Sequence, residues 1–550
     1  MAEKLPRSQS RERKASVAKH RAVISHNRSR NLQAFARKED GSLIIFGLFM
    51  LVLMLLACGM GLDLMRLETA RVQLQSTVDR AALAAANLNQ ELPPEQVVAD
   101  YFEKAHLSEF LSGVQVDEDT GLRRVAVQTS LDMPMHFMSM AGVNTLPAPA
   151  SGVAEESIGD VEISMVLDVS GSMNSYNRLT NLKGAAEDFV DTVYGLASHG
   201  IVSTSIVPYA TQVSAGPDLL SQYNLGTETH DDSHCVNFDQ SSFGSTALPT
   251  TVELQQTQHF DPWYNSQDLR LPVCRDEAGV DVLAWSRSPA EIKDRVNALV
   301  AGGNTSTDVG VKWGNALLDP GSRDVLHSLA DDGLVDESLR GRPYQFNSGD
   351  AMKVMVVMSD GVHTQQYYMK DAYRGDLLTN VWASFNGNGD VIKFSIWSGD
   401  GPEPQESNNW YVPNDEFYWP HAGQWKDRPH NHTHAVRLTY QQLWAHVTVR
   451  HHAYDHVEPV WGAAARDEIL NSYTYVQPSA KNDNLIEGCD AAKDRGVVVF
   501  SVGLEVTPAS GQLLEDCATS PNHYFLVNGQ DLSYAFKSIA GQINQLRLTQ

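Results

Sequence analysis

The chain contains one uninterrupted apolar run, from Ser42 to Leu62, with 21 residues and no charged side chain. As a helix, a run of this length crosses a bilayer. Apolar residues continue beyond it at three- and four-residue steps, at Leu64, Leu67, Leu74, Val78, Ala81 and Ala85. Such steps place side chains on one helix face. The pattern predicts one long helix, with a transmembrane part over residues 42–62 and a helical stalk over residues 63–92, ended by Pro93 and Pro94.

Shorter patterns follow over residues 93–158. A helical spacing covers about 97–110, and alternating residues predict strands near 114–116 and 124–130 with an Asp- and Gly-containing turn between them. The Pro- and Ala-rich segment 145–152 is either an edge strand or a linker. We expect a small α+β spacer here.

From residue 159 onward, apolar runs alternate with amphipathic segments. The runs that predict strands cover 161–169, 201–209, 352–360, 496–504 and 523–527. Helical spacing covers 181–197, 289–300, 309–318, 509–517 and 530–546. This alternation is typical of a doubly wound, mostly parallel α/β domain of Rossmann-like architecture. Ligands of such domains bind beyond the carboxyl ends of the strands.

Charge separates the two sides of the apolar run. The net charge of −25 argues against nucleic acid as a partner, yet residues 1–40 hold eleven Lys and Arg against four acidic residues. By the positive-inside rule, the basic tail over 1–41 is cytoplasmic and the rest of the chain lies outside. The alternatives are a buried helix, a cleaved signal peptide, or lipid attachment at Cys58, although signal sequences usually have apolar stretches of about 7–15 residues.

Cysteine usage agrees with an oxidising compartment. Besides Cys58 the chain has four cysteines, Cys235, Cys274, Cys489 and Cys517. An even number outside the membrane suggests two disulfides, and three pairings are possible. We favour the nearest-neighbour pairs, Cys235 with Cys274 and Cys489 with Cys517. In the opposite orientation they would be buried thiols.

The N-terminal order of features resembles TadG-like Flp (Tad) pilus assembly proteins. The residues that carry this resemblance are Gly41, Asp63, Arg71, Leu74, Gln75, Asp79, Ala81, Ala82, Leu83 and Ala84. True prepilins carry Glu at the fifth position after the glycine, whereas this chain has Phe46. The departure favours a retained membrane anchor over a processed pilin subunit.

Candidate metal ligands lie at the ends of predicted strands. Asp168, Ser170 and Ser172 form an Asp-x-Ser-x-Ser motif directly after the first strand, Thr305 precedes a helix, and Asp360 closes the strand over 352–360. Hydroxyl and carboxylate oxygens suit hard cations such as Mg²⁺, Ca²⁺ or Mn²⁺. All three elements fall on one edge of the predicted sheet, with Thr307 as the alternative to Thr305.

These motifs resemble the von Willebrand factor A-type domain with its metal-ion-dependent adhesion site. The resemblance implies that Ser170, Ser172 and Thr305 touch a divalent ion, while Asp168 or Asp360, or both, act through water. It also implies that an acidic side chain of a protein partner completes the coordination. Neutral hydroxyls leave the ion under-neutralised, so that it attracts such a carboxylate. A vestigial site that binds no ion is the alternative.

The C-terminal sequence is also similar to TadG-type A domains. The matching segments are 489–493, 496–503, 513–518, 523–525 and 546–548. Two large insertions, at about 210–288 and 362–480, remain outside the resemblance. The first has the composition of a surface loop closed by Cys235–Cys274.

Histidines concentrate in the second insertion, which holds nine of the nineteen. His430 with His434, and His452 with His456, have the four-residue step that would place two imidazoles on one helix face for zinc. A loop-rich insertion with an aromatic core and solvent-facing imidazoles is the favoured interpretation. Asn431 and Ala453 stand where a metalloprotease helix would carry its glutamate.

The resemblance implies a non-enzymatic interaction protein of a Flp/Tad pilus system in a bacterial inner membrane, while the residues themselves predict only the anchor and the ion site. A single span would hold a C-terminal domain that is periplasmic or exposed at the surface. The expected partners are an acidic protein surface and other pilus assembly or pseudopilin subunits. The alternatives are a cell-surface adhesin that uses the same metal site and, less favoured, a metal-dependent hydrolase, since no nucleophile elbow or HExxH motif is present.

Overall fold

The computed structural model describes residues 42–547, except 88, 89, 91, 120, 121, 158, 196–200, 228, 347–350, 387, 389, 400–415 and 530. The basic tail over 1–41, with Gly41, lies outside the described residues, as does Leu548. The chain divides into two compact units, Met1–Ser157 and Ile158–Gln550.

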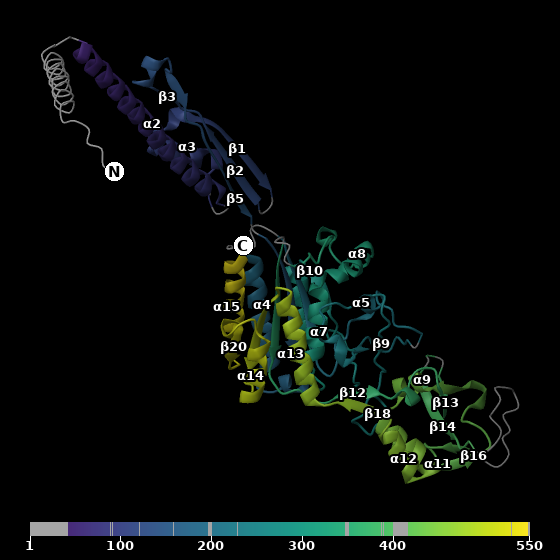
Figure 1. Ribbon diagram of the computed structural model, residues 1–550. Helices are drawn as coiled ribbons and strands as arrows, with labels where there is room; N and C mark the ends of the chain where they lie inside the picture. The colour runs from purple at the N-terminus through teal and green to yellow at the C-terminus, as the bar shows by residue number, and fades with distance from the viewer. Residues whose placement is uncertain are drawn as a thin grey trace, which may run out of the picture. The chain divides into compact units, whose positions relative to one another are not determined.

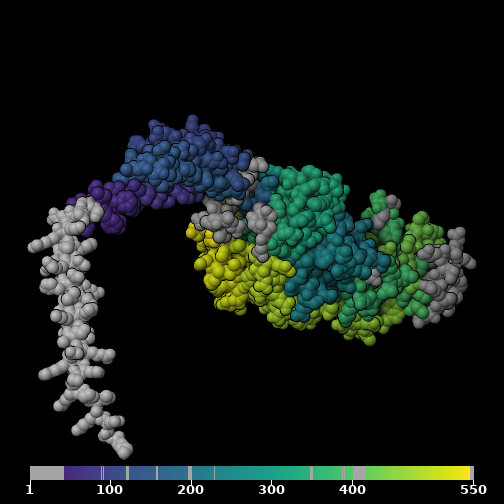
Figure 2. Space-filling view, turned by 45° about the horizontal axis from the view of Figure 1, so that its top comes forward, coloured from purple at the N-terminus to yellow at the C-terminus, as the bar shows by residue number. Residues whose placement is uncertain are grey.

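The first unit is built on one helix, α2 (Ser42–Ala86), whose 45 residues make it about 68 Å long. The most apolar stretch of α2 is almost uncovered by the described chain, with 6% of it buried. In Figure 2 this purple part of α2 projects beyond the blue body of the unit. The long helix is present as the sequence predicts, and its apolar part is not a buried core helix.

The second half of α2 packs against a small α+β body. This body consists of α3 (Pro94–Lys104) and an antiparallel sheet in the order β1 (Leu111–Asp119), β2 (Leu122–Thr129) and β5 (Ala150–Ser157). Leu74, Val78 and Ala81 are fully buried in its core. A Cβ on Gly152 would lie 2.8 Å from Val78 Cγ1, so the missing side chain lets β5 approach α2. Residues 63–86, expected as part of a helical stalk over 63–92, therefore also supply the core helix of the spacer.

The second unit contains a six-stranded sheet in the order β10-β7-β6-β11-β19-β20. Its strands are β6 (Asp160–Asp168), β7 (Val202–Tyr209), β10 (Leu283–Ser286), β11 (Ala351–Ser359), β19 (Val498–Leu504) and β20 (Tyr524–Val527). All neighbours are parallel except β10, which pairs antiparallel with β7. The strand order reverses between β6 and β11. In doubly wound sheets, ligands bind at this switch point.

Helices cover both faces of this sheet (Figure 1). One face carries α4 (Arg178–Gly195), α6 (Pro289–Ala298) and α15 (Leu532–Arg547); the other carries α7 (Thr307–Leu318), α8 (Arg323–Asp331), α13 (Pro478–Asp494) and α14 (Pro508–Cys517). Consecutive strand residues point to opposite faces, so Met165 enters the first core and Val166 the second. The doubly wound α/β fold is confirmed.

The first insertion is not the surface loop that its composition suggests. It contains α5 (Pro217–Leu220), β8 (Val236–Asn237) and β9 (Gln255–Gln256). Phe238 packs edge-on against Trp313 of α7, and every residue of α7 is buried. The apolar residues of this insertion follow neither a helical nor a strand period, and they bury themselves on α7. The predicted disulfides Cys235–Cys274 and Cys489–Cys517 are both present.

The second insertion folds around its own core. It has a five-stranded sheet in the order β16-β15-β14-β13-β17 and a two-stranded pair of β12 with β18. Its strands are β12 (Gln366–Met369), β13 (Leu378–Phe385), β14 (Val391–Trp397), β15 (Phe417–Trp419), β16 (Gln424–Lys426), β17 (Ala435–Thr439) and β18 (Tyr473–Val476). Its helices are α9 (Tyr440–His446), α10 (Val449–His451), a π-helix (His452–Val457), α11 (Glu458–Trp461) and α12 (Ala463–Leu470). Its interior contains aromatic residues such as Trp382, Phe417 and Trp444, as the sequence predicts, together with a larger number of buried aliphatic residues.

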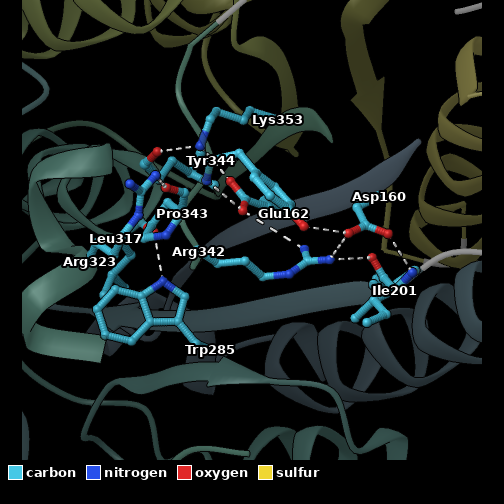
Figure 3. A network of polar contacts seen from close by, with 12 residues as sticks. Asp160, Glu162, Ile201, Trp285, Leu317, Arg323, Arg342, Pro343, Tyr344 and Lys353 are labelled. Carbon is cyan, nitrogen blue, oxygen red and sulfur yellow. Dashed lines mark hydrogen bonds and ion pairs between the residues drawn. The ribbon is translucent and has the colours of Figure 1, made fainter. Parts of the chain in front are cut away.

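A buried polar network closes the amino end of the sheet. Arg342 is 1% exposed and pairs with Asp160, and its Nη1 lies 3.8 Å from Glu162 Oε1. Lys353 pairs with the other oxygen of Glu162, and the backbone N–H of Tyr344 donates to Glu162 Oε1 at 3.0 Å. Figure 3 shows Arg342 reaching between the two carboxylates. These ion pairs and hydrogen bonds hold the segment around Arg342 against the amino ends of β6 and β11.

Candidate metal centre at the carboxyl edge of the sheet

The first loop of the site leaves β6 at Asp168 and turns tightly. The backbone N–H of Ser170 donates to Asp168 Oδ1 at 2.8 Å, and the hydroxyls of Ser170 and Ser172 lie 3.0 Å apart. Asp168 and Ser170 are buried, whereas Ser172 is exposed. The loop thus presents a row of oxygens that runs from the sheet to the surface.

The neighbouring strand β11 brings the second carboxylate. Ser172 Oγ donates to Asp360 Oδ1 at 2.7 Å, and Ser359 Oγ donates to Asp168 Oδ2 at 3.0 Å. The Tyr209 hydroxyl at the end of β7 also points to Asp168 Oδ2, at 3.3 Å. Asp168, Ser170, Ser172 and Asp360 therefore form one continuous hydrogen-bonded chain across the switch point.

The loop before α7 lies against the Asp-x-Ser-x-Ser loop. The backbone N–H of Gly171 donates to Gly303 O, and that of Gly302 donates to Val169 O, both at 2.9 Å. A Cβ on Gly171 would lie 3.1 Å from Gly303 O, a contact tighter than nearly all real side chains make. Glycine at position 171 thus permits the close approach of the two loops.

The two candidate threonines on this loop differ in their partners. Thr305 Oγ1 forms no hydrogen bond with any described residue, although the backbone N–H of Thr305 donates to Thr364 Oγ1 at 2.8 Å. Thr307 Oγ1 donates to the Tyr209 hydroxyl at 3.1 Å. The Thr305 hydroxyl is therefore the one with unused donor and acceptor capacity.

An arginine pairs with one of the carboxylates. Arg178, the first residue of α4, donates through Nη1 to Asp360 Oδ2 at 2.8 Å and through Nη2 to Glu505 Oε2 at 2.9 Å. The Asp360 side chain is fully buried, and Arg178 is 14% exposed. The ion pair compensates one of the two buried carboxylates at this edge.

The second carboxylate lacks such a partner. Burial, and then the charge of Asp360, raise the pKa of Asp168 to about 6. A raised carboxyl pKa indicates a local shortage of positive charge. The oxygens of Asp168, Ser170, Ser172 and Asp360 form a hard donor set, which fits a divalent cation such as Mg²⁺, Ca²⁺ or Mn²⁺.

The second insertion is joined to this edge by a buried lysine. Lys481, in the first turns of α13, donates to Thr305 O at 2.6 Å, to Ser306 Oγ at 2.6 Å and to Thr364 O at 2.8 Å. Burial lowers the pKa of Lys481 to about 8. The lysine therefore holds both ends of the second insertion, at Thr364 and at α13, against the loop that carries Thr305.

Several of these residues escape the sequence prediction. Tyr209 and Glu505 stand where β7 and β19 end, so the rule that ligands gather at strand ends would have found them. Arg178 follows the Asp-x-Ser-x-Ser motif closely. For Lys481 the sequence offers no signal, because its partners lie more than one hundred residues away.

The histidines of the second insertion do not form a metal cluster. His430 lies outside any helix, and a short 3-10 turn covers His432–His434. His452 and His456 lie on the π-helix with their Nδ1 atoms 3.1 Å apart, and both are buried. Within the described ranges, no three His, Cys, Asp or Glu side chains are placed to hold a metal ion together. Unlike the favoured expectation, these two imidazoles do not face solvent.

Comparisons with known proteins match different stretches of the chain. Residues 41–88 match the family model described as putative Flp pilus-assembly TadE/G-like. No curated protein matches the chain. A similar solved structure is the vWF domain of the type V pili tip protein Mfa5 from Porphyromonas gingivalis, with 18% identity and a TM-score of 0.30 over 70% of this chain and 96% of that one.

Two pilus adhesins are similar at comparable levels. SpaC from Lactobacillus rhamnosus GG has 12% identity and a TM-score of 0.29, over 79% of this chain and 33% of SpaC. RrgA from Streptococcus pneumoniae has 13% identity and a TM-score of 0.25, over 79% of this chain and 48% of RrgA. The chain thus spans less than half the length of either adhesin. The family model covers the whole of α2, and the N-terminal segment over residues 41–88 is therefore TadE/G-like.

Proposed function

We propose that this chain is a membrane-anchored, extracytoplasmic component of Flp/Tad pilus assembly that binds a protein partner through a divalent cation. In this proposal α2 crosses the bacterial inner membrane once, with residues 1–41 in the cytoplasm. The chain beyond residue 62 then lies outside, in the periplasm or at the cell surface. The basic tail before the apolar run and the two disulfides beyond it support this orientation. The TadE/G-like segment supports the pilus role.

One observation supports the cation site above all others: the hydrogen-bonded chain from Asp168 through Ser170 and Ser172 to Asp360 at the switch point. These four residues and Thr305 would hold Mg²⁺, Ca²⁺ or Mn²⁺. Because hydroxyl ligands are neutral, part of the positive charge of a bound ion would remain uncompensated. Ser359 and Tyr209 fix the orientation of Asp168 by hydrogen bonds to its Oδ2.

The surface around the site suits an acidic partner. Ser172 is exposed, so an outside carboxylate can reach the edge of the site. Tyr176 is 81% exposed, and the Arg178 guanidinium lies 5.5 Å from its ring centroid. We propose that an acidic side chain of a pilus or pseudopilin subunit docks here. The TadE/G-like segment favours binding over hydrolysis as the role of this site.

Calorimetric titration of Mg²⁺, Ca²⁺ and Mn²⁺ into the full chain in lipid nanodiscs tests the site. We expect saturable binding to the wild type, and its loss in Asp168→Ala and in the double variant Ser170→Ala/Ser172→Ala. Asp324→Ala, at an exposed aspartate of α8, is the matched control and should bind normally. Equal binding by the wild type and Asp168→Ala would refute the site.

Complementation of a deletion strain tests the cellular role. If the chain is an assembly component, we expect the deletion strain to lack pili. The wild-type chain and Asp324→Ala should restore pili in this strain, whereas Asp168→Ala should not. Normal pili with poor attachment would make the chain an adhesin instead. Metal-dependent turnover of a substrate would be required for the hydrolase alternative.

A further inference from the structure

A hairpin of the first unit folds back onto the end of the apolar run. β3 (Asp132–Pro134) pairs with β4 (Thr145–Pro147), and the turn between them contains a short 3-10 helix, Met138–Ala141. Figure 1 shows β3 beside α2 on the N-terminal side of the sheet. The tip of this hairpin, residues 135–143, is called the hairpin tip below.

The hairpin tip is attached to Asp63, the first charged residue after the apolar run. Three backbone N–H groups of the tip donate to its carboxylate, from His136 at 3.2 Å, Phe137 at 2.6 Å and Met138 at 2.9 Å. Asp63 is 1% exposed. The contact therefore places the tip at the level where α2 leaves the apolar run.

The tip also reaches into the apolar run itself. A Cβ built on Gly59 would lie 2.3 Å from Phe137 Cδ1, so the Phe137 ring rests directly on the backbone of α2. Gly59 lies four residues before Asp63, about 6 Å along the helix axis. If residues 42–62 lie in a bilayer, the Phe137 ring lies at the depth of its outer layer.

Backbone polar groups at this depth need partners within the protein. Besides the three N–H groups on Asp63, Met135 N donates to Asn144 O at 2.9 Å and Met140 N to Phe137 O at 3.1 Å. Gly142 N and Val143 N donate to the carbonyls of residues 139 and 138, both at 3.0 Å. Most N–H groups of the tip are thus already satisfied without water.

Apart from His136, the exposed side chains of the tip are apolar. Met140 is 72% exposed and Phe137 40% exposed. No Lys, Arg, Asp or Glu occurs over residues 133–154. Leu62 and Met65, near the end of the apolar run in α2, are exposed apolar residues too. Exposed apolar side chains next to a membrane span are typical of an interfacial anchor.

We propose that the hairpin tip is a second membrane contact, which inserts Phe137 and Met140 into the outer interfacial layer of the bilayer that α2 crosses. This inference rests on the membrane-spanning part of the proposed function. Its occupant is phospholipid, because the tip rests on the apolar run at Gly59. Two contacts at one level fix the rotation of α2 and hold the small unit against the membrane surface.

Depth-dependent fluorescence quenching tests the proposal in the full chain. In a Cys58→Ser background, a single cysteine at Met140, at Met54 in the apolar run, or at Glu95 on exposed α3 carries an environment-sensitive dye. The chain alone is reconstituted in phosphatidylcholine and phosphatidylglycerol vesicles with lipids that carry a nitroxide quencher at a shallow or a deep position. We expect shallow quenching at Met140, deep quenching at Met54 and none at Glu95.

The outcomes separate the two proposals. A dye at Met140 that stays unquenched while the Met54 dye is quenched would overturn the hairpin contact and assign its apolar surface to a protein partner. An unquenched dye at Met54 would instead refute the membrane span.

A matched glycine pair controls for indirect effects. Gly59→Ala places a methyl group where the Phe137 ring lies, whereas Gly61→Ala meets nothing within 4 Å. We expect Gly59→Ala to displace the tip and to abolish shallow quenching at Met140, and Gly61→Ala to preserve it. Equal quenching in both variants would show that the tip is not held on α2 at Gly59.

Discussion

Arg178 Nη1 lies 2.8 Å from Asp360 Oδ2, so a protein cation already occupies one side of the candidate metal centre. The Asp360 side chain is fully buried, and its other oxygen accepts from Ser172. A divalent ion bound to this row of oxygens would lie close to the guanidinium and would be repelled by it. The ion pair compensates Asp360 in the ion-free chain, and it would weaken the binding of an ion.

Removal of the arginine should tighten cation binding. For Arg178→Met, we expect the affinity for Mg²⁺ to rise roughly tenfold, about 1.4 kcal/mol, because a competing charge is lost. Without the ion, the variant should unfold more easily, since Asp360 is left buried and unpaired. Calorimetric titration and thermal unfolding with and without Mg²⁺ check both effects. Arg428→Met, at an exposed arginine paired with Asp427, is the control. Weaker Mg²⁺ binding by Arg178→Met would mean that the arginine serves the site by positioning Asp360.

The two threonines before and within α7 allow a test of which hydroxyl binds the ion. Valine has nearly the shape of threonine without the hydroxyl. Thr305→Val should lower the cation affinity roughly tenfold or more, because its hydroxyl makes no hydrogen bond to any described residue. Thr307→Val should leave the affinity unchanged and cost about 1 kcal/mol of stability, because its hydroxyl donates to Tyr209. The opposite pattern in calorimetry and urea unfolding would assign the ligand to Thr307.

Sequence patterns were sufficient for five of the six strands of the sheet and for placing Asp168 and Asp360 at one edge of it. Strands such as β6 and β11 are buried on both faces, so they appear as continuous apolar runs. Because parallel strands end at one edge, Asp168 and Asp360 could be predicted to lie together without any contact information. Whether these residues bind a metal ion stays a prediction.

The remaining features of the fold depend on contacts between residues far apart in the sequence, and local patterns do not predict such contacts. The stripe of Leu74, Val78 and Ala81 predicted a buried helix face. The sequence did not indicate that strand β5 covers this face, because β5 lies far from it along the chain. The edge strand β10 has four residues and an irregular register, too short for a clear pattern. In the first insertion, Phe238 is buried because it packs against Trp313 of α7. The spacing of apolar residues around Phe238 does not predict this contact.

The buried network under the sheet predicts unequal effects of two nearby arginines. Arg342→Met leaves Asp160 and Glu162 without their arginine partner, and such a loss costs about 3–5 kcal/mol. Arg340 pairs with Asp331 and Glu337 near the surface, so Arg340→Met should change stability little. Urea unfolding of the full chain in detergent, followed by fluorescence, compares the two. Similar midpoints for both variants would contradict a structural role of the network.

The buried imidazoles of the second insertion predict loss of its stability in acid. Burial lowers the pKa of His452 to about 3, and burial with the nearby His452 and His451 lowers the pKa of His456 well below its ordinary value. In the unfolded chain both would take up protons below about pH 6.5. The folded state binds fewer protons, so stability is full above that pH and falls as the pH drops toward 3. The loss is up to about 2 kcal/mol per imidazole at pH 5.

This pH dependence can be followed locally, because the Trp444 ring lies 5.4 Å from the His452 ring. We expect the fluorescence of Trp444 to report a lower urea midpoint at about pH 5 than at about pH 7.5, as linkage requires. In His452→Leu/His456→Leu the midpoint should depend less on pH, because no imidazole is left to be protonated on unfolding. The exposed His434→Leu should behave as the wild type. An unchanged pH dependence in the double variant would mean that carboxyl groups, and not this buried pair, control the acid stability of the insertion.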